Sequence, residues 1–467
     1  MGFSFSVCFY VYLRDMGVKS LLKKIIPKGL FDVIEPAGHW LEAFFIHLLH
    51  GFPLRGIKVI GVTGTNGKTS TSFLIHRMLV ESGYNAGLMT TVAYGVGREI
   101  QPQVAHMTSV SAPELIRRVK AMKQQGMDWL VLETTSHALA QHRTWGVPYS
   151  IAVMTNVTHE HLDYHGTFER YVDAKRKLFL LTNRNKKGLQ LGIINAEDGN
   201  AEYFASAVAH AHTYGIKTGD IRAHNLKLTS GGSRYLAKIN DDEYKIECHL
   251  PGSFNVSNSL ATVLVGRALG LNKMQIQKGI AALDGVEGRM TRIDEGQDFD
   301  VIVDYAHTPD SFEKLFKDMR PVVKGRFIVL FGSAGRRDEA KRAVQGRLAG
   351  EYADEVVVTE EDDRDIDGQE IMNQIAEGAE SAGKKREKDL FLVHDRTEAI
   401  QFAVNRAKKG DTVLLLGKGH EKDILRNGPR AAELRHMPQD DHNPDRVVEF
   451  PWDEIATAHK ALKNRKK

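Results

Sequence analysis

Short apolar runs alternate with amphipathic helical periods along most of this chain, first from Leu54 to about Asp284 and then in a second series. Such alternation is typical of βα units around a mostly parallel sheet. The first series predicts strands at Val59–Thr63, Trp129–Thr134, Ile151–Asn156 and Leu191–Asn195, and helices at Ser70–Glu81, Pro113–Gln125, Phe168–Thr182, Val256–Leu271 and Lys273–Leu283. Between them, Arg222 to His249 alternates polar and apolar residues around a Gly231-Gly232 turn, which predicts a β excursion within or beside the sheet.

The second series follows a cluster of glycines between Asp284 and Gly296, which favours a domain boundary there. Its predicted strands are Val301–Tyr305, Phe327–Phe331, Glu355–Thr359, Leu390–Val393 and Thr412–Leu416. We therefore expect an α/β protein with three parts. These are a short N-terminal helical segment (residues 1–53), a central domain with a mostly parallel sheet (54–286) and a Rossmann-like C-terminal domain (287–467).

The segment that joins the first predicted strand to its helix is rich in glycine and ends in Lys-Thr. In such loops backbone N–H groups and the helix N-terminus cradle phosphates, the lysine reaches the outer phosphates, and the hydroxyl ligates Mg²⁺. The strict pattern G-x-x-x-x-G-K-[ST] is not met, because Val62 stands where its first glycine belongs and Gly64 makes the turn instead. The flanking strand and helix still favour a P-loop-type central domain over an ordinary βα loop with a surface lysine. The candidate nucleotide contacts are Gly64, Thr65, Asn66, Gly67, Lys68, Thr69 and Ser70.

Composition excludes several classes of protein. The chain has 467 residues, of which 42% are hydrophobic and 26% are charged, as in an ordinary soluble protein. Its net charge of +4 is small and the basic residues are interspersed with acidic ones, which argues against a nucleic-acid partner. Two cysteines, Cys8 and Cys248, are too few for a disulfide framework or a metal cluster, and they fit a reducing cytoplasm.

The first fifty residues contain two apolar stretches. Phe3 to Leu13 is too short to span a bilayer and lacks the charged start of a signal peptide, so no integral membrane span is predicted. Met16 begins a more typical opening, and we interpret residues 1–15 as lying upstream of the true translation start. From Ser20 to Leu49 lysines mix with aliphatic and aromatic residues. This pattern favours a helical pair packed on the next domain over a membrane-surface helix.

Carboxylates and histidines follow two of the predicted strands. Glu133 comes at the carboxyl end of its strand, where doubly wound sheets bind ligands, and a carboxylate there suits Mg²⁺. After the next strand, Thr155 to Thr167 holds three histidines and two carboxylates. Their spacing differs from the H-E-x-x-H zinc motif and no cysteine supports zinc, so a second Mg²⁺ site or a substrate-positioning loop fits better beside a nucleotide.

These motifs, with others further along the chain, resemble those of the Mur ligases, and among them the UDP-N-acetylmuramoyl-tripeptide synthetases. The resemblance runs from about Lys58 to Lys460 and keeps the family's order of motifs. The motifs are Gly64–Thr69, Glu133–Leu139, Asn156–Thr167 followed by Ala174-Lys175, Pro251–Asn258, Gly288–Met290, Asp304–Asp310, Gly332–Arg342 and Gly417–Glu421. Their conjunction is far more specific than any one of them.

The resemblance implies an ATP-dependent carboxylate–amine ligase of peptidoglycan precursor synthesis. Such an enzyme transfers the γ-phosphoryl group to a substrate carboxylate, and an amine then displaces phosphate from the acyl phosphate. It implies that Lys68 holds the outer phosphates, that Thr69 and Glu133 hold a first Mg²⁺, and that His161 and a carbamylated Lys175 hold a second. It also implies adenine contacts from Asn255 and Asn258, and closure of the C-terminal domain over the nucleotide by Asp304, His307 and Arg336 or Arg337.

The acceptor is less well specified. The residues implied for its sugar-peptide part are Ser136, His137, Arg143 and Thr108. Family members carry a longer segment before the phosphate loop, forming a domain that grips the uridine nucleotide, whereas 63 residues precede Gly64 here and do not resemble it. We therefore expect either that the uridine end is held differently or that the acceptor is a truncated, lipid-linked or otherwise altered muropeptide.

The loop that selects the added amino acid also departs from the family. Members that add meso-diaminopimelate carry Asp-Asn-Pro-Arg, which aligns here with Glu361-Asp362-Asp363-Arg364. The Arg364 guanidinium can grip a distal carboxylate, while Glu421, beside Gly417, can take the distal ammonium. Arg364 could instead pair with Asp365 or Asp362. The resemblance favours meso-diaminopimelate, with L-lysine as the alternative.

Two other functions stay open on the sequence alone. Folylpolyglutamate synthases share the ligase architecture and lack the uridine domain, although the Asp304–Asp310 and Gly417–Glu421 motifs favour the Mur ligases. The chain could also be a Mur-like nucleotide-binding subunit that works beside a partner enzyme. Such subunits often carry a cysteine-rich insert, and this sequence has none.

Overall fold

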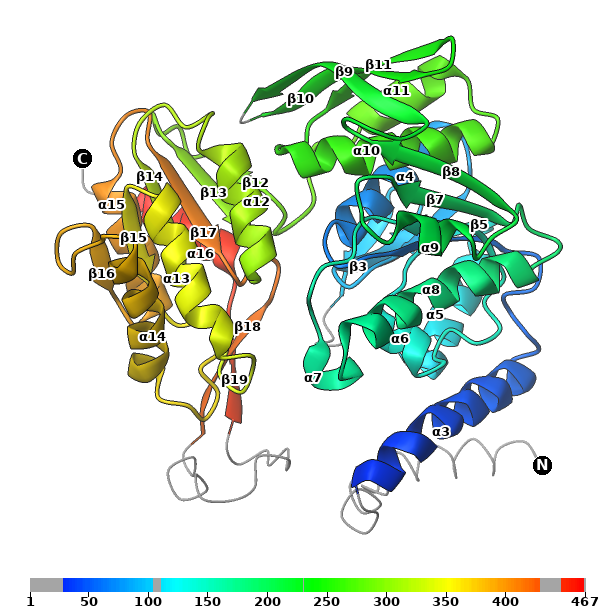
Figure 1. Cartoon of the computed structure of the whole chain (residues 1–467), viewed down its shortest axis with the longest axis horizontal. Coiled ribbons are helices and arrows are strands. Elements are labelled where there is room, and N and C mark those ends of the chain that lie inside the picture. The colour runs from blue at the N-terminus through cyan, green and yellow to red at the C-terminus, as the bar shows by residue number, and fades with distance from the viewer. Residues whose placement is uncertain (1–27, 104–110, 230, 429–446, 466–467) are drawn as a thin grey trace.

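The computed structural model describes residues 28–103, 111–229, 231–428 and 447–465, without the side chains of residues 28–37 and 163. Two sheet-based units lie side by side, and helix α3 (Lys28–Leu49) lies at the edge of the larger unit (Figure 1). The predicted boundaries after residues 53 and 286 fall between elements, and they stay predictions.

The larger unit is built on an eleven-stranded sheet in the order β11-β10-β9-β8-β7-β6-β1-β5-β2-β3-β4. The seven neighbouring strands from β9 to β2 run parallel, and antiparallel strands extend the sheet at both ends. Strand β1 pairs with β6 on one side and β5 on the other, which makes its carboxyl end the topological switch point where such sheets bind ligands. The strands are β1 Lys58–Thr63, β2 Ala86–Met89, β3 Ala93–Val96, β4 Glu99–Pro102, β5 Trp129–Glu133, β6 Tyr149–Met154, β7 Leu191–Asn195, β8 His210–Gly215, β9 Ile221–Thr229, β10 Gly232–Ile239 and β11 Asp242–Cys248.

Helices cover both faces of this sheet, because its central strands present apolar side chains on both sides. Ile60 and Val62 pack in a core with α4, α10 and α11, whereas Val59 and Leu130 pack in a second core with α3, α5 and α8. The helices are α4 Lys68–Glu81, α5 Ala112–Gln124, α6 Ser136–Ala140, α7 Leu162–His165, α8 Phe168–Arg184, α9 Ala201–Ala205, α10 Ser253–Ala268 and α11 Lys273–Ala281.

The smaller unit has a six-stranded sheet in the order β12-β13-β17-β14-β15-β16, parallel except for β12. Helices α12, α13 and α14 contribute to the core on one face, and α15 and α16 to the core on the other. A separate β18-β19 ribbon extends from this unit (Figure 1). The elements are β12 Thr291–Ile293, β13 Asp300–Asp304, α12 Pro309–Met319, β14 Phe327–Phe331, α13 Ala340–Tyr352, β15 Glu355–Val358, α14 Gly368–Ser381, β16 Leu390–Leu392, α15 Arg396–Arg406, β17 Thr412–Leu416, β18 Asp423–Asn427, β19 Val447–Pro451 and α16 Glu454–Lys463.

The α/β fold with a mostly parallel central sheet and a second sheet unit is confirmed. The β excursion at Arg222 to His249 joins the large sheet as its antiparallel end. Of the helical pair expected at Ser20 to Leu49, the described part is one continuous helix, Lys28–Leu49, and residues 20–27 lie outside the described residues. The interpretation of residues 1–15 concerns positions outside the described residues. Within those, no helix combines the length and apolar character needed to cross a membrane.

Candidate active site

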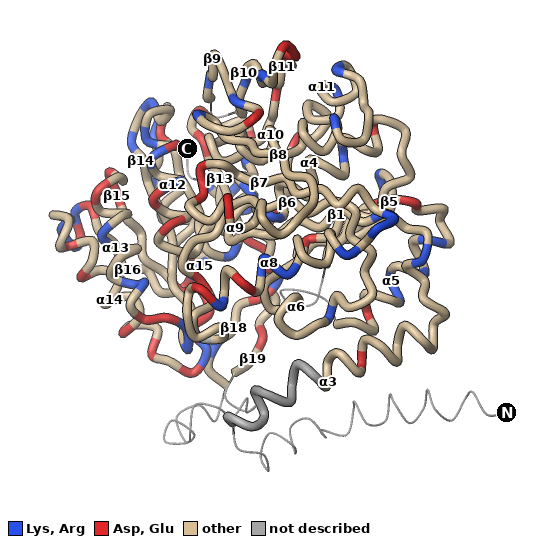
Figure 2. The backbone as a smooth tube through the Cα atoms, turned by 45° about the vertical axis from the view of Figure 1, so that its right-hand side comes forward, with Lys and Arg blue, Asp and Glu red and all other residues tan. Residues whose placement is uncertain are grey.

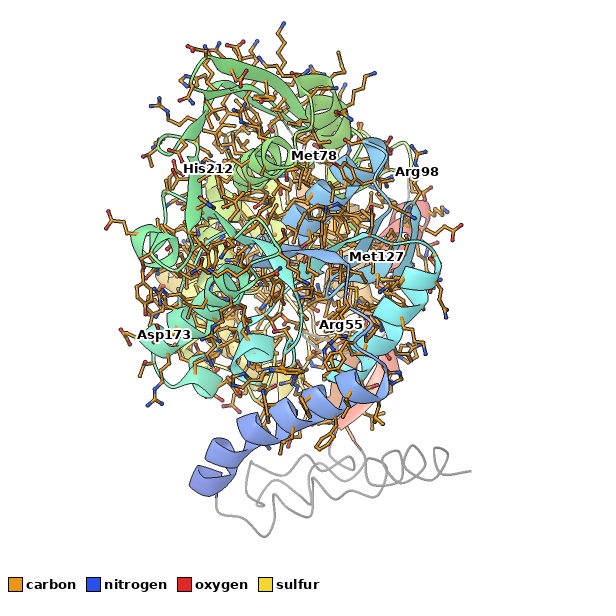
Figure 3. All side chains as sticks on the ribbon, turned by 90° about the vertical axis from the view of Figure 1, so that its right-hand side faces the viewer. Arg55, Met78, Arg98, Met127, Asp173 and His212 are labelled. Atoms are coloured by element: carbon orange, nitrogen blue, oxygen red, sulfur yellow. The ribbon has the colours of Figure 1, made fainter. Side chains whose placement is uncertain are left out.

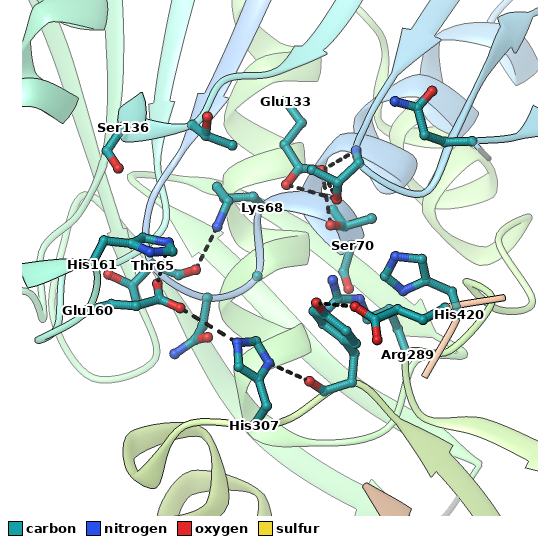
Figure 4. Close-up of a pocket in the computed structure, with 18 of the residues that line it drawn as sticks. Thr65, Lys68, Ser70, Glu133, Ser136, Glu160, His161, Arg289, His307 and His420 are labelled. Atoms are coloured by element: carbon teal, nitrogen blue, oxygen red, sulfur yellow. Dashed lines mark hydrogen bonds and ion pairs between the residues drawn. The ribbon is translucent and has the colours of Figure 1, made fainter. Parts of the chain in front are cut away.

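A cavity lies between the two units, at the carboxyl ends of β1, β5 and β6 on one side and of β13 and β17 on the other (Figure 4). It brings together residues that the sequence predicted from distant motifs. The predicted residues that line it are Thr65, Asn66, Gly67, Lys68, Thr69, Ser70, Glu133, Ser136, His161, Lys175, His307 and Glu421.

The phosphate loop has its conformation because two glycines allow it. Gly64 has φ of 151°, and a Cβ there would lie 1.9 Å from Thr155 Oγ1. Gly67 has φ of 81° directly before α4, and a Cβ there would lie 2.7 Å from Asn258 Oδ1. Both positions are strained or blocked for any residue with a side chain. The N-terminus of α4 therefore points its backbone N–H groups at the cavity, as an anion site requires.

Beside the loop, two side chains offer oxygen atoms to a hard cation. Thr69 Oγ1 donates to Glu133 Oε2 at 3.0 Å, and Thr91 donates to the same carboxylate from its backbone N–H at 3.2 Å and from its hydroxyl. Lys68 Nζ donates to the Thr65 carbonyl at 2.7 Å. A hydroxyl and a carboxylate beside a phosphate-binding loop fit Mg²⁺, which favours oxygen ligands.

Lys175 on α8 lies beneath the loop with its side chain 1% exposed. Its Nζ donates to the Gly64 carbonyl at 2.6 Å and lies 4.3 Å from the centroid of the Tyr171 ring. Burial, together with the nearby charge of Lys68, holds the pKa of Lys175 well below its ordinary value. Glu160 and Glu133 oppose this shift, but among the described residues no carboxylate lies within ion-pair distance of Lys175, so its pKa stays low.

Glu160 lies where the two units meet. Its carboxylate lies 3.7 Å from His161 Nε2 on the same loop and 3.8 Å from His307 Nε2 of the smaller unit (Figure 4). Burial raises the pKa of Glu160, but the positive groups around it, led by His161 and Lys68, hold it below its ordinary value. Burial also lowers the pKa of His307 to about 4, so this ring is neutral near pH 7. His307 donates from Nδ1 to the Tyr305 carbonyl, which leaves Nε2 as an acceptor.

The smaller unit contributes an acidic group and a buried lysine to its side of the cavity. Glu421 accepts from Tyr305 OH at 3.0 Å and from Lys418 Nζ at 2.6 Å. Lys418 is fully buried and also pairs with Asp362 at 2.9 Å. The two carboxylates raise the pKa of Lys418 despite its burial, so it is a cation that fixes Glu421 and the 361–364 loop together.

The loop aligned with the amino-acid selection motif lies next to this pair but does not line the cavity. Arg364 has φ of 56° and donates from Nη1 to the Gly335 carbonyl at 2.8 Å. The alternative pairing of Arg364 with Asp365 is not found, because Arg336 binds Asp365 in a bidentate way. Nor does any other carboxylate of the described residues lie within ion-pair distance of Arg364. Glu361 is buried next to Gly417, its Oε2 has no hydrogen-bond partner, and burial raises its pKa to about 7.

Several predicted residues lie outside the cavity lining. Asn255 and Asn258 are buried at the start of α10, where Asn258 approaches Gly67 and donates to Asn255 Oδ1. Asp304 accepts from the backbone N–H groups of Met290 and Ala306 and is therefore fully engaged within its own unit. The remaining predicted residues outside the lining are Gly64, Arg336, Arg337, His137, Arg143, Arg364 and Gly417, and Thr108 lies outside the described residues.

Other cavity residues were not predicted as site residues. Four of them, Glu160, Tyr305, Arg289 and His420, stand inside the family motifs, and those motifs are the sequence signal that marks them. Thr91 and Gln103 belong to no motif, and their positions follow from the pairing of β2, β3 and β4 at the sheet edge. The remaining lining residues are Thr135, Tyr171, Lys422 and Asp423.

Comparison with known proteins gives consistent matches over most of the chain. The model of the Mur ligase middle domain matches residues 62–266, and that of the Mur ligase glutamate ligase domain matches residues 288–419. A UDP-N-acetylmuramyl-tripeptide synthetase of Roseiflexus sp. (strain RS-1) is 39% identical over 425 residues, covering 88% of this chain and 80% of that protein. A UDP-N-acetylmuramoyl-L-alanyl-D-glutamate--2,6-diaminopimelate ligase of Geobacillus thermodenitrificans (strain NG80-2) is 38% identical over 393 residues, covering 83% and 79%.

Solved structures give the same picture of the fold. A structure of a UDP-N-acetylmuramoyl-L-alanyl-D-glutamate--2,6-diaminopimelate ligase aligns with a TM-score of 0.61 at 27% identity, covering 92% of this chain and 82% of that one. A folylpolyglutamate synthase of Mycobacterium tuberculosis aligns with a TM-score of 0.66 at 16% identity, covering 81% and 92%. At that identity the second match shows a shared fold and no more.

Proposed function

The chain belongs to the Mur ligase family, and from this premise we propose that it adds meso-diaminopimelate to a muramoyl-L-Ala-D-Glu type acceptor. As a member of the family it is an ATP-dependent ligase of peptidoglycan precursor synthesis that releases ADP and phosphate. One observation carries the assignment of the site. The phosphate loop with Lys68, the Thr69–Glu133 pair and the Tyr305–Glu421 pair of the other unit face a single cavity.

The reaction needs placement and charge neutralisation more than a protein nucleophile. Lys68 leaves the Thr65 carbonyl and donates to the outer phosphates, while the N–H groups at the start of α4 hold the rest. The acceptor carboxylate takes the γ-phosphoryl group, and the amine of the incoming amino acid then displaces phosphate. Because ATP is consumed, we place the reaction in the cytoplasm.

Two Mg²⁺ ions fit the oxygen and nitrogen atoms around the loop. Thr69 and Glu133 would hold the first ion, and His161 with a carbamylated Lys175 would hold the second. When bound, Mg²⁺ supplies positive charge to the phosphates and orients them. Lys175 supports this reading because it is buried and no carboxylate of the described residues lies within ion-pair distance of it, and a carbamate would turn it into an anionic ligand. Its depressed pKa favours the neutral amine, which is the form that reacts with CO₂.

The remaining site residues keep the roles implied by the family motifs. Asn258 lies beside Gly67 and donates to Asn255, and both would contact adenine as the nucleotide base extends from the loop. Ser136 lines the cavity and is bonded to His165, so it is a suitable contact for the acceptor. Burial, with His161 and His165 nearby, lowers the pKa of His137 to about 3, so that ring would contact the acceptor as a neutral group. Arg143, which lies outside the cavity lining, would complete the set of acceptor contacts.

Selection of the amino acid rests on Arg364 and Glu421. Arg364 has a carbonyl and no carboxylate as its partner among the described residues, so its guanidinium remains able to grip a distal carboxylate. Glu421, fixed by Tyr305 and Lys418, would take the distal ammonium. L-lysine is the second candidate, because Glu361 and Asp362 add negative charge next to Arg364.

The acceptor is tested by amino-acid-dependent phosphate release from ATP. Three acceptors are compared: UDP-N-acetylmuramoyl-L-Ala-D-Glu, the sugar-free dipeptide L-Ala-D-Glu, and a reduced folate. We expect turnover with the muramoyl acceptor. Turnover with the folate alone would replace this function by folylpolyglutamate synthesis, and ATP binding without turnover on any acceptor would favour a subunit that needs a partner enzyme.

For the amino acid, we expect Arg364→Ala to raise the KM for meso-diaminopimelate by roughly 10-fold to 100-fold and to leave the KM for ATP nearly unchanged, because a charge-assisted bidentate contact is lost. Arg347→Ala is the matched control, since Arg347 is an exposed arginine of α13 that pairs with Glu351. Equal small changes in both KM values would refute the assignment. A wild-type preference for L-lysine over meso-diaminopimelate would select the second candidate.

A further inference from the structure

The amide side chain of Gln103 borders the cavity with one of its two hydrogen-bonding ends unused. Gln103 follows β4 and is 9% exposed, and its Nε2 has no hydrogen-bond partner among the described residues. A buried N–H2 group that donates to nothing costs free energy, so such groups are rare in folded proteins. At the wall of a cavity, the missing oxygen is one that a ligand can supply.

Arg118 of α5 fixes which end of the amide is unused. Its Nη1 donates to Gln103 Oε1, and because a guanidinium has donors and no acceptor, the amide must present its oxygen there. Arg118 is held in turn by Glu114, which accepts from Nε at 2.5 Å, and by the ring of Tyr94, whose centroid lies 3.8 Å from Cζ. The oxygen of Gln103 therefore faces Arg118, and its N–H2 group is turned away from it.

Arg118 differs from the other basic residues of its helix. Figure 2 shows several basic positions along α5, and the other three are exposed. Arg118 is 8% exposed, and its charge is matched by Glu114. A buried guanidinium is costly unless hydrogen-bonded partners compensate it. We therefore interpret Arg118 as a residue that positions Gln103, and not as a source of positive charge for the cavity.

The β3–β4 hairpin brings Gln103 to the cavity. Arg98, in the turn between these strands, lies at the outside of the larger unit (Figure 3). At the opposite end of the hairpin, Gln103 donates from its backbone N–H to the Val92 carbonyl at 2.7 Å. The neighbouring Thr91 donates to Glu133, the carboxylate at the end of β5 that pairs with the phosphate loop. Since β5 lies between β1 and β2 in the sheet, Gln103 is on the far side of Glu133 from the phosphate loop.

We propose that Gln103, positioned by Arg118, binds the acceptor by donating from its N–H2 group to a carbonyl or carboxylate oxygen of the acceptor's peptide. This inference rests on the proposed function. The phosphates of ATP are met by Lys68 and the N-terminus of α4. The acceptor carboxylate that takes the γ-phosphoryl group must lie beyond that phosphate, and the peptide that carries this carboxylate extends further from the loop. A neutral amide backed by a matched ion pair suits a peptide oxygen, whereas the phosphates are met by a full cation.

Gln103→Glu separates binding from structure. A glutamate of the same shape keeps the oxygen that Arg118 binds and replaces the N–H2 donor by a second, charged oxygen. In amino-acid-dependent phosphate release from ATP, we expect the KM for UDP-N-acetylmuramoyl-L-Ala-D-Glu to rise by roughly 30-fold or more, because a donor is lost and a negative oxygen faces the acceptor oxygen. The KM values for ATP and for the amino acid should change by less than about twofold. The matched control is Gln101→Glu, at an exposed position of β4, which should behave as the wild type does.

Two further variants grade the effect. Gln103→Met removes the donor without adding charge, so the acceptor KM should rise by a smaller factor, roughly 5-fold to 20-fold. Arg118→Met lets the amide turn, and its effect on the acceptor KM should not add to that of Gln103→Met in the double variant, because both act through one hydrogen bond. The thermal midpoint of Gln103→Glu should equal or exceed that of the wild type, since its carboxylate forms a charged pair with Arg118. A purely structural role would leave the acceptor KM of Gln103→Glu unchanged.

Equilibrium titration of the acceptor, with a non-hydrolysable ATP analogue present, reads the same contact without turnover. Normal turnover by the wild type, with an unchanged acceptor KM in Gln103→Glu and Gln103→Met, overturns the inference and leaves the proposed function standing. A rise in the KM for ATP alone assigns the donor to the nucleotide and also overturns it. A wild type that neither turns over nor binds the muramoyl acceptor is a failure of the proposed function, and the inference falls with it.

Discussion

At the scale of single residues, Lys175 illustrates how much of the site depends on tertiary contacts. The sequence identified it only through a family motif, as one lysine of a helix with several basic residues. Its burial, its bond to the Gly64 carbonyl and its proximity to Lys68 depend on α8 packing under β1, more than a hundred residues away in the chain. Glu160 is similar, because its contact with His307 exists only where the two units meet.

If Lys175 is carbamylated, Lys175→Ala should lower kcat by roughly 100-fold or more, since the change removes a metal-ligating group. The protein should stay folded, because the effect on core packing is smaller than the effect on metal binding. Short carboxylic acids such as acetate should restore part of the activity by occupying the vacated space. Lys186→Ala, at an exposed position just after α8, is the control and should retain full activity. Carbon-13 NMR after equilibration with labelled CO₂ reads the modification directly. A bare Lys175 in a fully active enzyme would end this interpretation.

Glu361 gives a prediction for pH. Burial raises the folded-state pKa of this carboxyl to about 7 from an ordinary value of 4.5. The unfolded state therefore loses its proton first as pH rises, and the resulting loss of stability accumulates between about pH 4.5 and pH 7. Glu361→Gln, which cannot ionise, should escape this loss. Its stability gain over wild type should be larger at pH 8 than at pH 5.5 by on the order of 2 kcal/mol.

Urea unfolding at pH 5.5, 6.5 and 8 measures this difference, with exposed Glu377→Gln as the control. A gain that is independent of pH would show that Glu361 is already ionised in the folded state.

At the scale of elements, the sequence predicted best the strands that are buried on both faces. Phe327–Phe331, Leu191–Asn195 and Thr412–Leu416 were found with their observed bounds because each is an uninterrupted apolar run between polar segments. The β2–β3–β4 edge was missed. Its strands are four residues long and owe their pairing to β5 and to one another. Two cavity residues, Thr91 and Gln103, were therefore not predicted. No local sequence signal marks a short strand whose formation depends on pairing with neighbouring strands.

The turn between β1 and α4 gives the prediction at this scale. Gly64→Ala should destabilise the protein by roughly 2–4 kcal/mol and abolish nucleotide binding, because the new Cβ meets Thr155 Oγ1 in a backbone conformation that L-residues avoid. Gly199→Ala is the control, since nothing lies within 4 Å of its Cβ position. Thermal unfolding with and without ATP measures both effects. A Gly64→Ala protein that ATP still stabilises as it does the wild type would show that the loop can relax.

At the scale of the whole molecule, helix α12 connects the two units at both of its ends. Near its start, Asp310 accepts from Asn66 Nδ2 of the phosphate loop at 3.0 Å. Near its end, Asp318 accepts from the backbone N–H of Ser253, at the start of α10, at 2.6 Å and from its hydroxyl. In the sequence these aspartates look like surface acids of an amphipathic helix with lysines nearby. Their role as contacts between units cannot be predicted from sequence, because it depends on the relative position of two separately folded sheets.

Removing both contacts should weaken closure of the smaller unit over the nucleotide. We expect Asp310→Ala/Asp318→Ala to raise the KM for ATP by roughly threefold to tenfold and to lower kcat, while each unit keeps its core and the unfolding free energy changes by about 1–2 kcal/mol. Glu313→Ala is the control, since Glu313 lies on the same helix and forms an ion pair with Lys317 of that helix. Small-angle scattering of the nucleotide-free double variant should give a larger radius of gyration than the wild type, and ATP analogues should reduce the difference. Unchanged scattering together with an unchanged KM would mean that the remaining contacts between the units are sufficient to hold them together.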